Sequence, residues 1–304
     1  MPNSSFHPRN RHHGRYDFDQ LRSFLPELAQ FLKQNKAGET SIDFADPMAV
    51  KALNKALLLD YYQLAYWDIP PGFLCPAIPG RADYVHHIAD LLAEDGVLSA
   101  TQISGLDIGI GANAIYAIIA VMEYGWEMVG SDVSPQAIEA AQRIANQNVS
   151  LNGKLDCRLQ ARSEHFFRTI IREGERYSLS LCNPPFHASS EAASLANQRK
   201  RKGLGQANSA ALNFGGQAHE LWFPGGEERF VRMMAQESKH YADQCLWFTS
   251  LLSRKEHVRP LKKTLKKIGA ADVRLTNMAH GQKKSRIVAW TFQTAEDRSK
   301  WLSP

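Results

Sequence analysis

The residues with the clearest chemical potential are Asn183-Pro184-Pro185-Phe186, which directly follow an apolar run. A planar NH₂ group is a poor nucleophile because its lone pair is delocalised, and two oxygen acceptors on its hydrogens would draw the nitrogen toward tetrahedral geometry. The Asn183 side-chain carbonyl and the Pro184 backbone carbonyl could be these acceptors, with the prolines fixing their direction. Positioning would then dominate catalysis, and Phe186 offers a stacking face for a base swung out of its helix. The motif predicts methyl transfer to a planar NH₂ group, on adenine or on a glutamine amide.

A second motif, Asp107-Ile108-Gly109-Ile110-Gly111, falls at an expected strand-to-helix turn, and Asp132 ends the next expected strand. Two glycines permit a tight bend and a close backbone approach to a ligand, and a carboxylate after the next strand can accept both ribose hydroxyls of an adenosine. The loop also fits the looser G-x-G-x-x-A pattern of dinucleotide sites, or a turn without a ligand. Asp107 would repel a pyrophosphate but suits the cationic groups of S-adenosylmethionine. We therefore expect S-adenosylmethionine as the cofactor, bound by Asp107, Gly109, Gly111, Asp132 and Asn183.

Two further residues are candidates for contacts with this cofactor. Arg81 follows Pro79-Gly80, and its guanidinium could grip the cofactor's carboxylate through two hydrogen bonds. An exposed arginine at a helix start is the simpler interpretation. Ser163 follows the third expected strand, where groups that contact adenine fall in such sheets. Its ordinary role would be the N-cap of a helix.

The composition narrows the class of protein. The 304 residues, 44% hydrophobic and 22% charged, are typical of a soluble globular protein with one large domain or a domain and a subdomain. The sequence has no apolar run near the length of about 18 residues that spans a membrane and no secretory signal, so we expect a cytoplasmic protein. The four cysteines are widely spaced and the histidines lack the i, i+4 spacing of helical metal sites, so neither a disulfide nor a metal is expected.

The positive charge is clustered, although the net charge is only +5. Residues 1–16 are basic, Arg199 to Lys202 form a run of four cations, and residues 251–290 carry eleven Lys or Arg against two acids. Such clusters indicate a polyanion partner. The expected substrate-binding residues are Pro185 and Phe186 with the cations Arg9, Arg11, Arg199, Lys200, Arg201 and Lys202.

The hydrophobic patterns predict alternating strands and helices. Strands are expected over 102–108, 127–132, 155–160, 177–182, 244–250, 271–276 and 286–293, and helices over 18–35, 46–64, 81–94, 112–124, 135–149, 163–172, 227–241 and 254–268. This order predicts parallel βαβ units in a Rossmann-like, doubly wound, mostly parallel seven-stranded sheet, an α/β fold with a closing hairpin. We expect a mobile basic arm (1–16), a helical N-terminal subdomain (17–100) and the main domain (101–304). The long stretch 188–226 is expected to be a substrate-binding loop.

With these motifs in view, the chain resembles the large-subunit (23S) ribosomal RNA adenine-N6 methyltransferases of bacteria, whose eukaryotic relatives methylate structured RNAs. The resemblance spans nearly the whole chain and is carried by His7 to Arg11, Tyr16 to Phe18, Pro79 to Tyr84, Asp107 to Ala112 with Ile115-Tyr116, Asn183 to Phe186, and Gly225 to Glu227. It implies a class I methyltransferase fold, donor contacts from Arg81, Gly109, Asp132, Ser163 and Asn183, and an adenine held by Asn183 to Phe186. Some relatives have Glu in place of Asp132, and this difference should be tolerated.

The resulting hypothesis is an S-adenosylmethionine-dependent RNA adenine-N6 methyltransferase, with Asn183, Pro184 and Phe186 as catalytic residues. Its partner would be ribosomal RNA of the large subunit or of an assembly intermediate, and we expect a monomer without a membrane or metal. Two alternatives remain open: a protein glutamine N5-methyltransferase, and a non-catalytic RNA-binding assembly factor with a vestigial donor pocket.

Overall fold

The central element of the computed structural model is one seven-stranded sheet; the structure describes residues 6–35, 37–97, 102–194, 216–280 and 283–301. The strand order is β5-β4-β3-β6-β7-β9-β8. β9 runs antiparallel to both of its neighbours, and the other neighbouring pairs are parallel. The strands are β3 (Ser104–Ile108), β4 (Glu127–Asp132), β5 (Leu155–Leu159), β6 (Tyr177–Cys182), β7 (Cys245–Leu252), β8 (Asp272–His280) and β9 (Lys283–Thr291). The predicted α/β fold, including the final hairpin, is confirmed.

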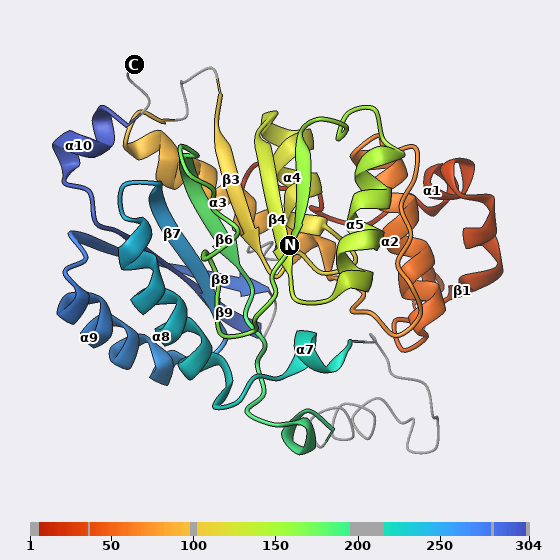
Figure 1. Cartoon of the computed structure of the whole chain (residues 1–304). Coiled ribbons are helices and arrows are strands. Elements are labelled where there is room, and N and C mark those ends of the chain that lie inside the picture. Colours follow the sequence, from red (N-terminus) through yellow and green to blue (C-terminus); the bar gives the residue numbers. More distant parts are fainter. Residues whose placement is uncertain (1–5, 36, 98–101, 195–215, 281–282, 302–304) are drawn as a thin grey trace.

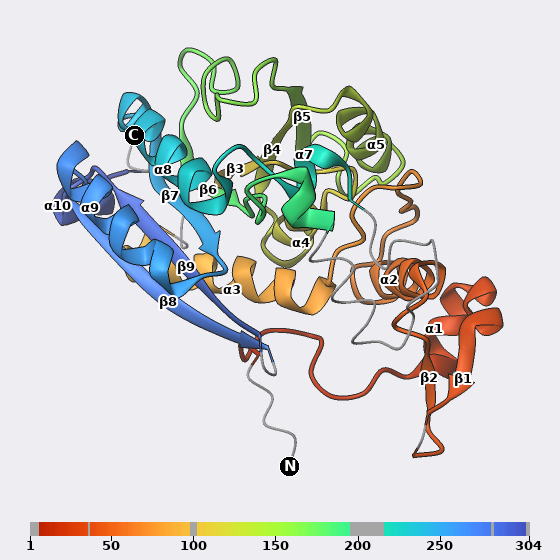
Figure 2. The same ribbon diagram turned by 90° about the horizontal axis from the view of Figure 1, so that it is seen from below.

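Helices cover both faces of this sheet (Figures 1 and 2). On one face, α3 (Ile78–Glu94), α4 (Ile115–Tyr124) and α5 (Pro135–Asn146) share one hydrophobic cluster with the strands, and α2 (Pro47–Tyr61) packs into the same cluster. On the other face, α8 (Gly226–Ser238) and α9 (Val258–Ile268) form a second cluster. Because α2 and α3 share the core of the sheet, the expected subdomain 17–100 has no separate core. Within the described residues, no helix has both the length and the apolarity needed to cross a membrane.

The predicted helix over 18–35 is wrong. The chain forms α1 (Phe18–Phe24), a 3₁₀ helix η1 (Pro26–Phe31) and then β1 (Leu32–Gln34), which pairs antiparallel with β2 (Thr40–Ile42). Pro26 ends α1 because its ring lacks an N–H donor and clashes with the preceding turn. The apolar spacing still identified core residues, since Leu21 and Leu28 are buried.

The predicted helix over 163–172 is also wrong. The segment is a series of turns, although Phe166, Phe167, Ile170 and Ile171 are buried as the apolar spacing required. The carboxylate of Glu237 on α8 accepts hydrogen bonds from the backbone N–H groups of Phe166, Phe167 and Arg168 at 3.0, 2.9 and 2.8 Å. These bonds satisfy the backbone without a helix.

The expectation of a mobile arm over residues 1–16 is wrong for residues 6–16. His7, Asn10 and His12 are buried, with exposed fractions of 8%, 2% and 3%. The His7 backbone N–H donates to Asp83 of α3 at 3.0 Å, and the His12 ring bonds the Tyr62 hydroxyl at 3.0 Å. The segment is fixed because its polar side chains find buried partners on the helices that it crosses.

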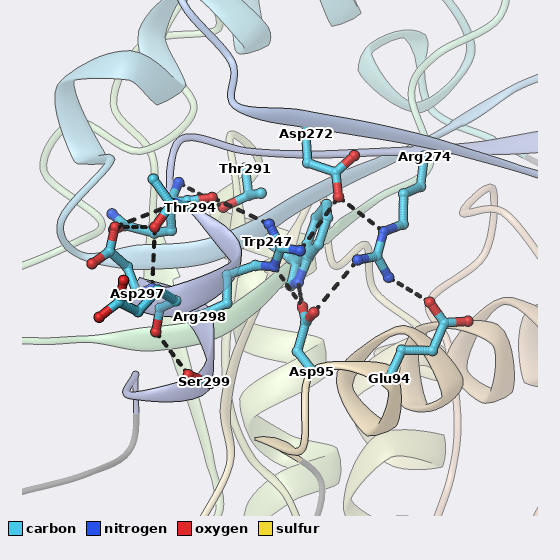
Figure 3. Close-up of polar contacts among 12 residues, drawn as sticks. Glu94, Asp95, Trp247, Asp272, Arg274, Thr291, Thr294, Asp297, Arg298 and Ser299 are labelled. Atoms are coloured by element: carbon cyan, nitrogen blue, oxygen red, sulfur yellow. Dashed lines mark hydrogen bonds and ion pairs between the residues drawn. The ribbon is translucent and has the colours of Figure 1, made fainter.

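A buried network of charges lies at the amino ends of the parallel strands, on the opposite side of the sheet from their carboxyl ends (Figure 3). The Asp95 carboxylate accepts from Trp247 Nε1 at 2.7 Å and pairs with Arg298 Nε at 3.0 Å and with Arg274 at 3.4 Å. Both guanidinium groups also lie over the Trp247 ring, at 4.9 and 5.3 Å from its centroid. The network joins the end of α3, strand β8 and the C-terminal helix α10 (Ala295–Ser299).

We expect Arg298→Ala to lower the free energy of unfolding by about 3 kcal/mol, because it leaves the buried Asp95 charge partly unpaired. Chemical denaturation measures this loss. The matched control is Arg143→Ala, whose side chain is 52% exposed and pairs with Glu139; it should cost under about 1 kcal/mol. Equal losses in the two variants would contradict a structural role for the network.

Candidate active site

A pocket opens at the carboxyl ends of β3, β4, β5 and β6, where open α/β sheets bind ligands. Seven of the predicted site residues line it: Arg81, Gly109, Gly111, Asp132, Ser163, Asn183 and Pro185. Pro184 and Phe186 are not among the lining residues, and Asp107 lies fully buried behind the pocket wall. The structure therefore brings together residues from positions 81 to 185 into one cavity.

The backbone N–H groups of the glycine-rich turn are hydrogen-bonded to the end of β4. The N–H groups of Gly109 and Ile110 both donate to the Ser131 carbonyl at 2.9 Å, and Gly111 N–H donates to Asp132 Oδ2 at 3.0 Å. A dinucleotide pyrophosphate would need such N–H groups as donors. Because they are already engaged, the geometry disfavours the dinucleotide alternative.

Three carboxyl groups make the pocket and its wall acidic. Burial, and next the charge of Asp132, raise the pKa of Asp107 to about 7, while the positive charge of Arg81 opposes this rise. Neither Asp107 oxygen has a hydrogen-bond partner within the described structure. Burial also raises the pKa of Asp132, and it raises that of Glu220 to about 7. Buried carboxyls, and above all the unpaired oxygens of Asp107, fit a ligand that carries positive charge.

Arg81, Tyr116 and Asn183 form a chain of contacts across the pocket. The Arg81 guanidinium donates to the Tyr116 hydroxyl at 2.8 Å and lies 5.4 Å from the centre of that ring. With its amide oriented so that the oxygen faces Arg81, Asn183 accepts from the two terminal nitrogens at 3.3 and 3.2 Å. The arginine thus sits on the amide oxygen that the sequence predicts to be catalytic.

Two residues that the sequence analysis missed, His219 and Glu220, also line the pocket. They belong to α7 (Ala218–Leu221), in the described end of the long loop. Glu220 Oε2 accepts from the backbone N–H groups of Leu74 and Gln217 at 3.1 and 2.7 Å, and His219 Nε2 lies 3.5 Å from Asp132 Oδ1. Glu220 is the sole acid between residues 192 and 226, which is the signal that could have found it.

The segment that contains α7 is hydrogen-bonded to His187, the residue that follows Phe186. His187 N–H donates to the Leu221 carbonyl at 3.1 Å, and Phe223 N–H donates to the His187 carbonyl at 3.0 Å. The end of the long loop therefore bridges the cofactor side of the pocket and the Asn-Pro-Pro-Phe motif. The predicted cations Arg199 to Lys202 lie outside the described residues.

Arg9 and Arg11 are engaged within the protein. Arg9 pairs with Asp90 at 2.6 Å, and Arg11 pairs with Glu123 at 2.7 Å. In the described part of the chain, His7, His87 and Asp90 could bring ligand atoms together for a metal ion. Since Arg9 and the His7 ring already occupy the Asp90 carboxylate, we assign no metal there.

The fold and the pocket define a class I methyltransferase, with the pocket at the carboxyl ends of the strands and the Asn-Pro-Pro-Phe motif beside it. A family model described as RNA methyltransferase matches residues 1–294, and the chain belongs to this family.

A sequence relative and two solved structures support the same classification. The chain is 53% identical over 297 residues to a ribosomal RNA large subunit methyltransferase F of Escherichia coli, covering 98% of this chain and 96% of that protein. The structure is similar to the human METTL16 catalytic domain in complex with a MAT2A 3′UTR hairpin, with a TM-score of 0.77, 29% identity and coverage of 95% and 98%. It is also similar to the N-terminal domain of human METTL16 in complex with SAH, with a TM-score of 0.76, 26% identity and coverage of 95% and 99%.

Proposed function

We propose that this protein transfers a methyl group from S-adenosylmethionine to the exocyclic N6 of an adenine in large-subunit ribosomal RNA. The observation that carries the proposal is the position of Asn183, which lines an acidic donor pocket at the end of β6. The Escherichia coli relative, named for the large ribosomal subunit, supports the class of substrate.

The pocket residues fit S-adenosylmethionine, which when bound supplies a methyl group on a positively charged sulfur. Asp107, Asp132 and Glu220 would stabilise its positive charges, and Asp132 would also accept the ribose hydroxyls. Ser163, beyond β5, would face the adenine. Arg81 would bind its carboxylate, a better acceptor for a guanidinium than an amide oxygen is.

The exchange of partners at Arg81 has a consequence for Asn183. When Arg81 turns to a ligand carboxylate, the Asn183 oxygen is released to accept a hydrogen bond from the N6 amino group. The Pro184 carbonyl would take the second N6 hydrogen, and Phe186 would stack on the base. In this proposal, binding of the donor prepares the acceptor site.

The alternative function, a protein glutamine N5-methyltransferase, would place the methyl group on a protein side chain. The basic composition and the RNA relatives favour RNA over a glutamine side chain.

We also propose that the chain acts as a metal-free monomer in the cytoplasm. One chain supplies all the pocket residues named here.

The test is to incubate the protein with methyl-labelled donor and protein-free large-subunit ribosomal RNA. We expect label in N6-methyladenosine after digestion to nucleosides. Label in glutamine of a protein added in parallel, with none in RNA, would overturn the proposal in favour of the amide alternative. Donor binding without any transfer would favour the assembly-factor alternative.

A further inference from the structure

Helices α8 and α9, with the residues directly beside them, present a dense group of cations on the outside of the molecule. Ten Lys or Arg side chains are exposed, and we call them the α8–α9 basic surface: Arg229, Arg232, Lys239, Arg254, Lys255, Arg259, Lys262, Lys263, Lys266 and Lys267. In the segments 226–239 and 254–268, Glu256 is the only exposed acid. The excess of positive charge is therefore local and large.

The described residues do not neutralise this surface through ion pairs. Several exposed cations elsewhere pair with acids, as Arg143 does with Glu139 and Lys300 with Glu296, although others such as Lys154 have no ion pair with a described residue. None of the ten cations forms an ion pair with any described residue, whereas Arg9, Arg11 and Arg15 of the N-terminal segment all do. A group of cations that is available to a partner therefore lies on and beside α8 and α9, and not in the N-terminal segment where the sequence predicted one.

The arrangement on α9 is unfavourable for an isolated helix. Lys262 and Lys266, and likewise Lys263 and Lys267, are separated by four residues and so lie next to each other on the helix surface. Like charges at this spacing destabilise a helix. The opposite face buries Leu261 and Leu265, so packing holds the helix in place. A bound polyanion would remove the repulsion.

The α8–α9 basic surface begins beside the acceptor motif. Phe230 of α8 lines the pocket, and Gly226 lies so close to Ala188 that an added Cβ would be 3.4 Å from its backbone. The buried Glu227 joins the two helix starts, since it accepts from Ser253 N–H at 2.7 Å and from His257 Nδ1 at 2.6 Å. From this edge α8 and α9 run side by side along the face of the sheet (Figures 1 and 2).

We propose that the α8–α9 basic surface binds the phosphates of the RNA that flanks the target adenine. The inference rests on the proposed function and adds a second contact region outside the pocket. The described residues of α8 and α9 include no exposed large hydrophobic side chain. Protein interfaces need an apolar centre, whereas nucleic-acid interfaces are polar and positively charged. RNA is therefore the better match.

The experiment compares two variants that each lose four positive charges. One carries Lys262→Gln, Lys263→Gln, Lys266→Gln and Lys267→Gln. The matched control carries Arg22→Gln, Lys33→Gln, Arg143→Gln and Lys154→Gln, at exposed positions on or beside α1, β1, α5 and β5. Affinity for protein-free large-subunit ribosomal RNA is measured between about 50 and 200 mM salt, the range over which phosphate contacts weaken strongly. Calorimetry measures donor affinity.

We expect the α9 variant to lose about tenfold in RNA affinity and up to about three units in the slope of log affinity against log salt, because each phosphate contact contributes about 0.7–0.9. The control should change both quantities by much less, and both variants should keep wild-type donor affinity. Equal weakening by the two variants, or an unchanged α9 variant, would overturn the inference. If the wild type still methylates RNA in that case, the proposed function stands. A wild type with no affinity for RNA would overturn both.

Discussion

Asn183→Ala should abolish methyl transfer, with a loss of at least about a thousandfold in turnover. The half-buried amide lines the pocket beside Arg81, and alanine removes the oxygen that would hold the amino group of the acceptor. The side chain contributes no other hydrogen bond in the described structure, so the fold should be unaffected. Single-turnover transfer to RNA, donor affinity and thermal unfolding should be measured on the same preparation.

Asn183→Asp is the matched variant. It keeps an oxygen acceptor on a side chain of the same size, and it should therefore retain more activity than alanine, even though its charge would bind Arg81 more tightly. Alanine activity within tenfold of the wild type would contradict the assigned role of Asn183. Loss of activity accompanied by loss of donor binding would place Asn183 in the donor site alone.

Donor affinity should fall between about ten- and a hundredfold as the pH is lowered from 8 to 6. Burial raises the pKa values of Asp107 and Glu220 to about 7, so both groups are largely protonated at pH 6 in the free protein. A cationic ligand favours the ionised carboxylates, and binding must then release protons. Above pH 8 both groups are already ionised, and the affinity should level off.

Calorimetry in buffers of different ionisation enthalpy would count the released protons. Asp107→Asn and Glu220→Gln should each remove part of the pH dependence, because each replaces one ionising group by a neutral one of the same shape. Thermal unfolding identifies any variant that fails to fold. A pH-independent wild type would contradict the role of these carboxyl groups in binding the donor.

The sequence predicted the sheet and most of the pocket because both depend on local signals. Apolar runs identified the strands, and Gly109, Asp132 and Asn183 lie at or directly after the carboxyl ends of these strands. The errors arose where a distant residue decides the local structure. Glu237 replaces the helical hydrogen bonds of the segment 163–172. Pro26 is the exception, since its effect on the first helix is local and could have been foreseen.

Glu220 and the N-terminal segment show that functional contacts between distant residues are equally hard to predict from the sequence. Glu220 reaches the pocket through Leu74, 146 residues earlier in the chain, and no sequence spacing encodes that contact. The basic residues near the N-terminus were predicted to bind RNA because charge alone is visible in the sequence. Their acidic partners on α3 and α4 are visible only in the fold.

The docking of the N-terminal segment also has a consequence for synthesis. Arg11 precedes its partner Glu123 by 112 residues, and His7 precedes Asp90 by 83. At about 5–20 residues per second, the ribosome needs roughly 6–22 s to make the stretch between Arg11 and Glu123. During that interval Arg11 lacks the carboxylate with which it pairs in the folded protein. His7 to Arg11 are then open to proteases and chaperones until α3 and α4 have been made.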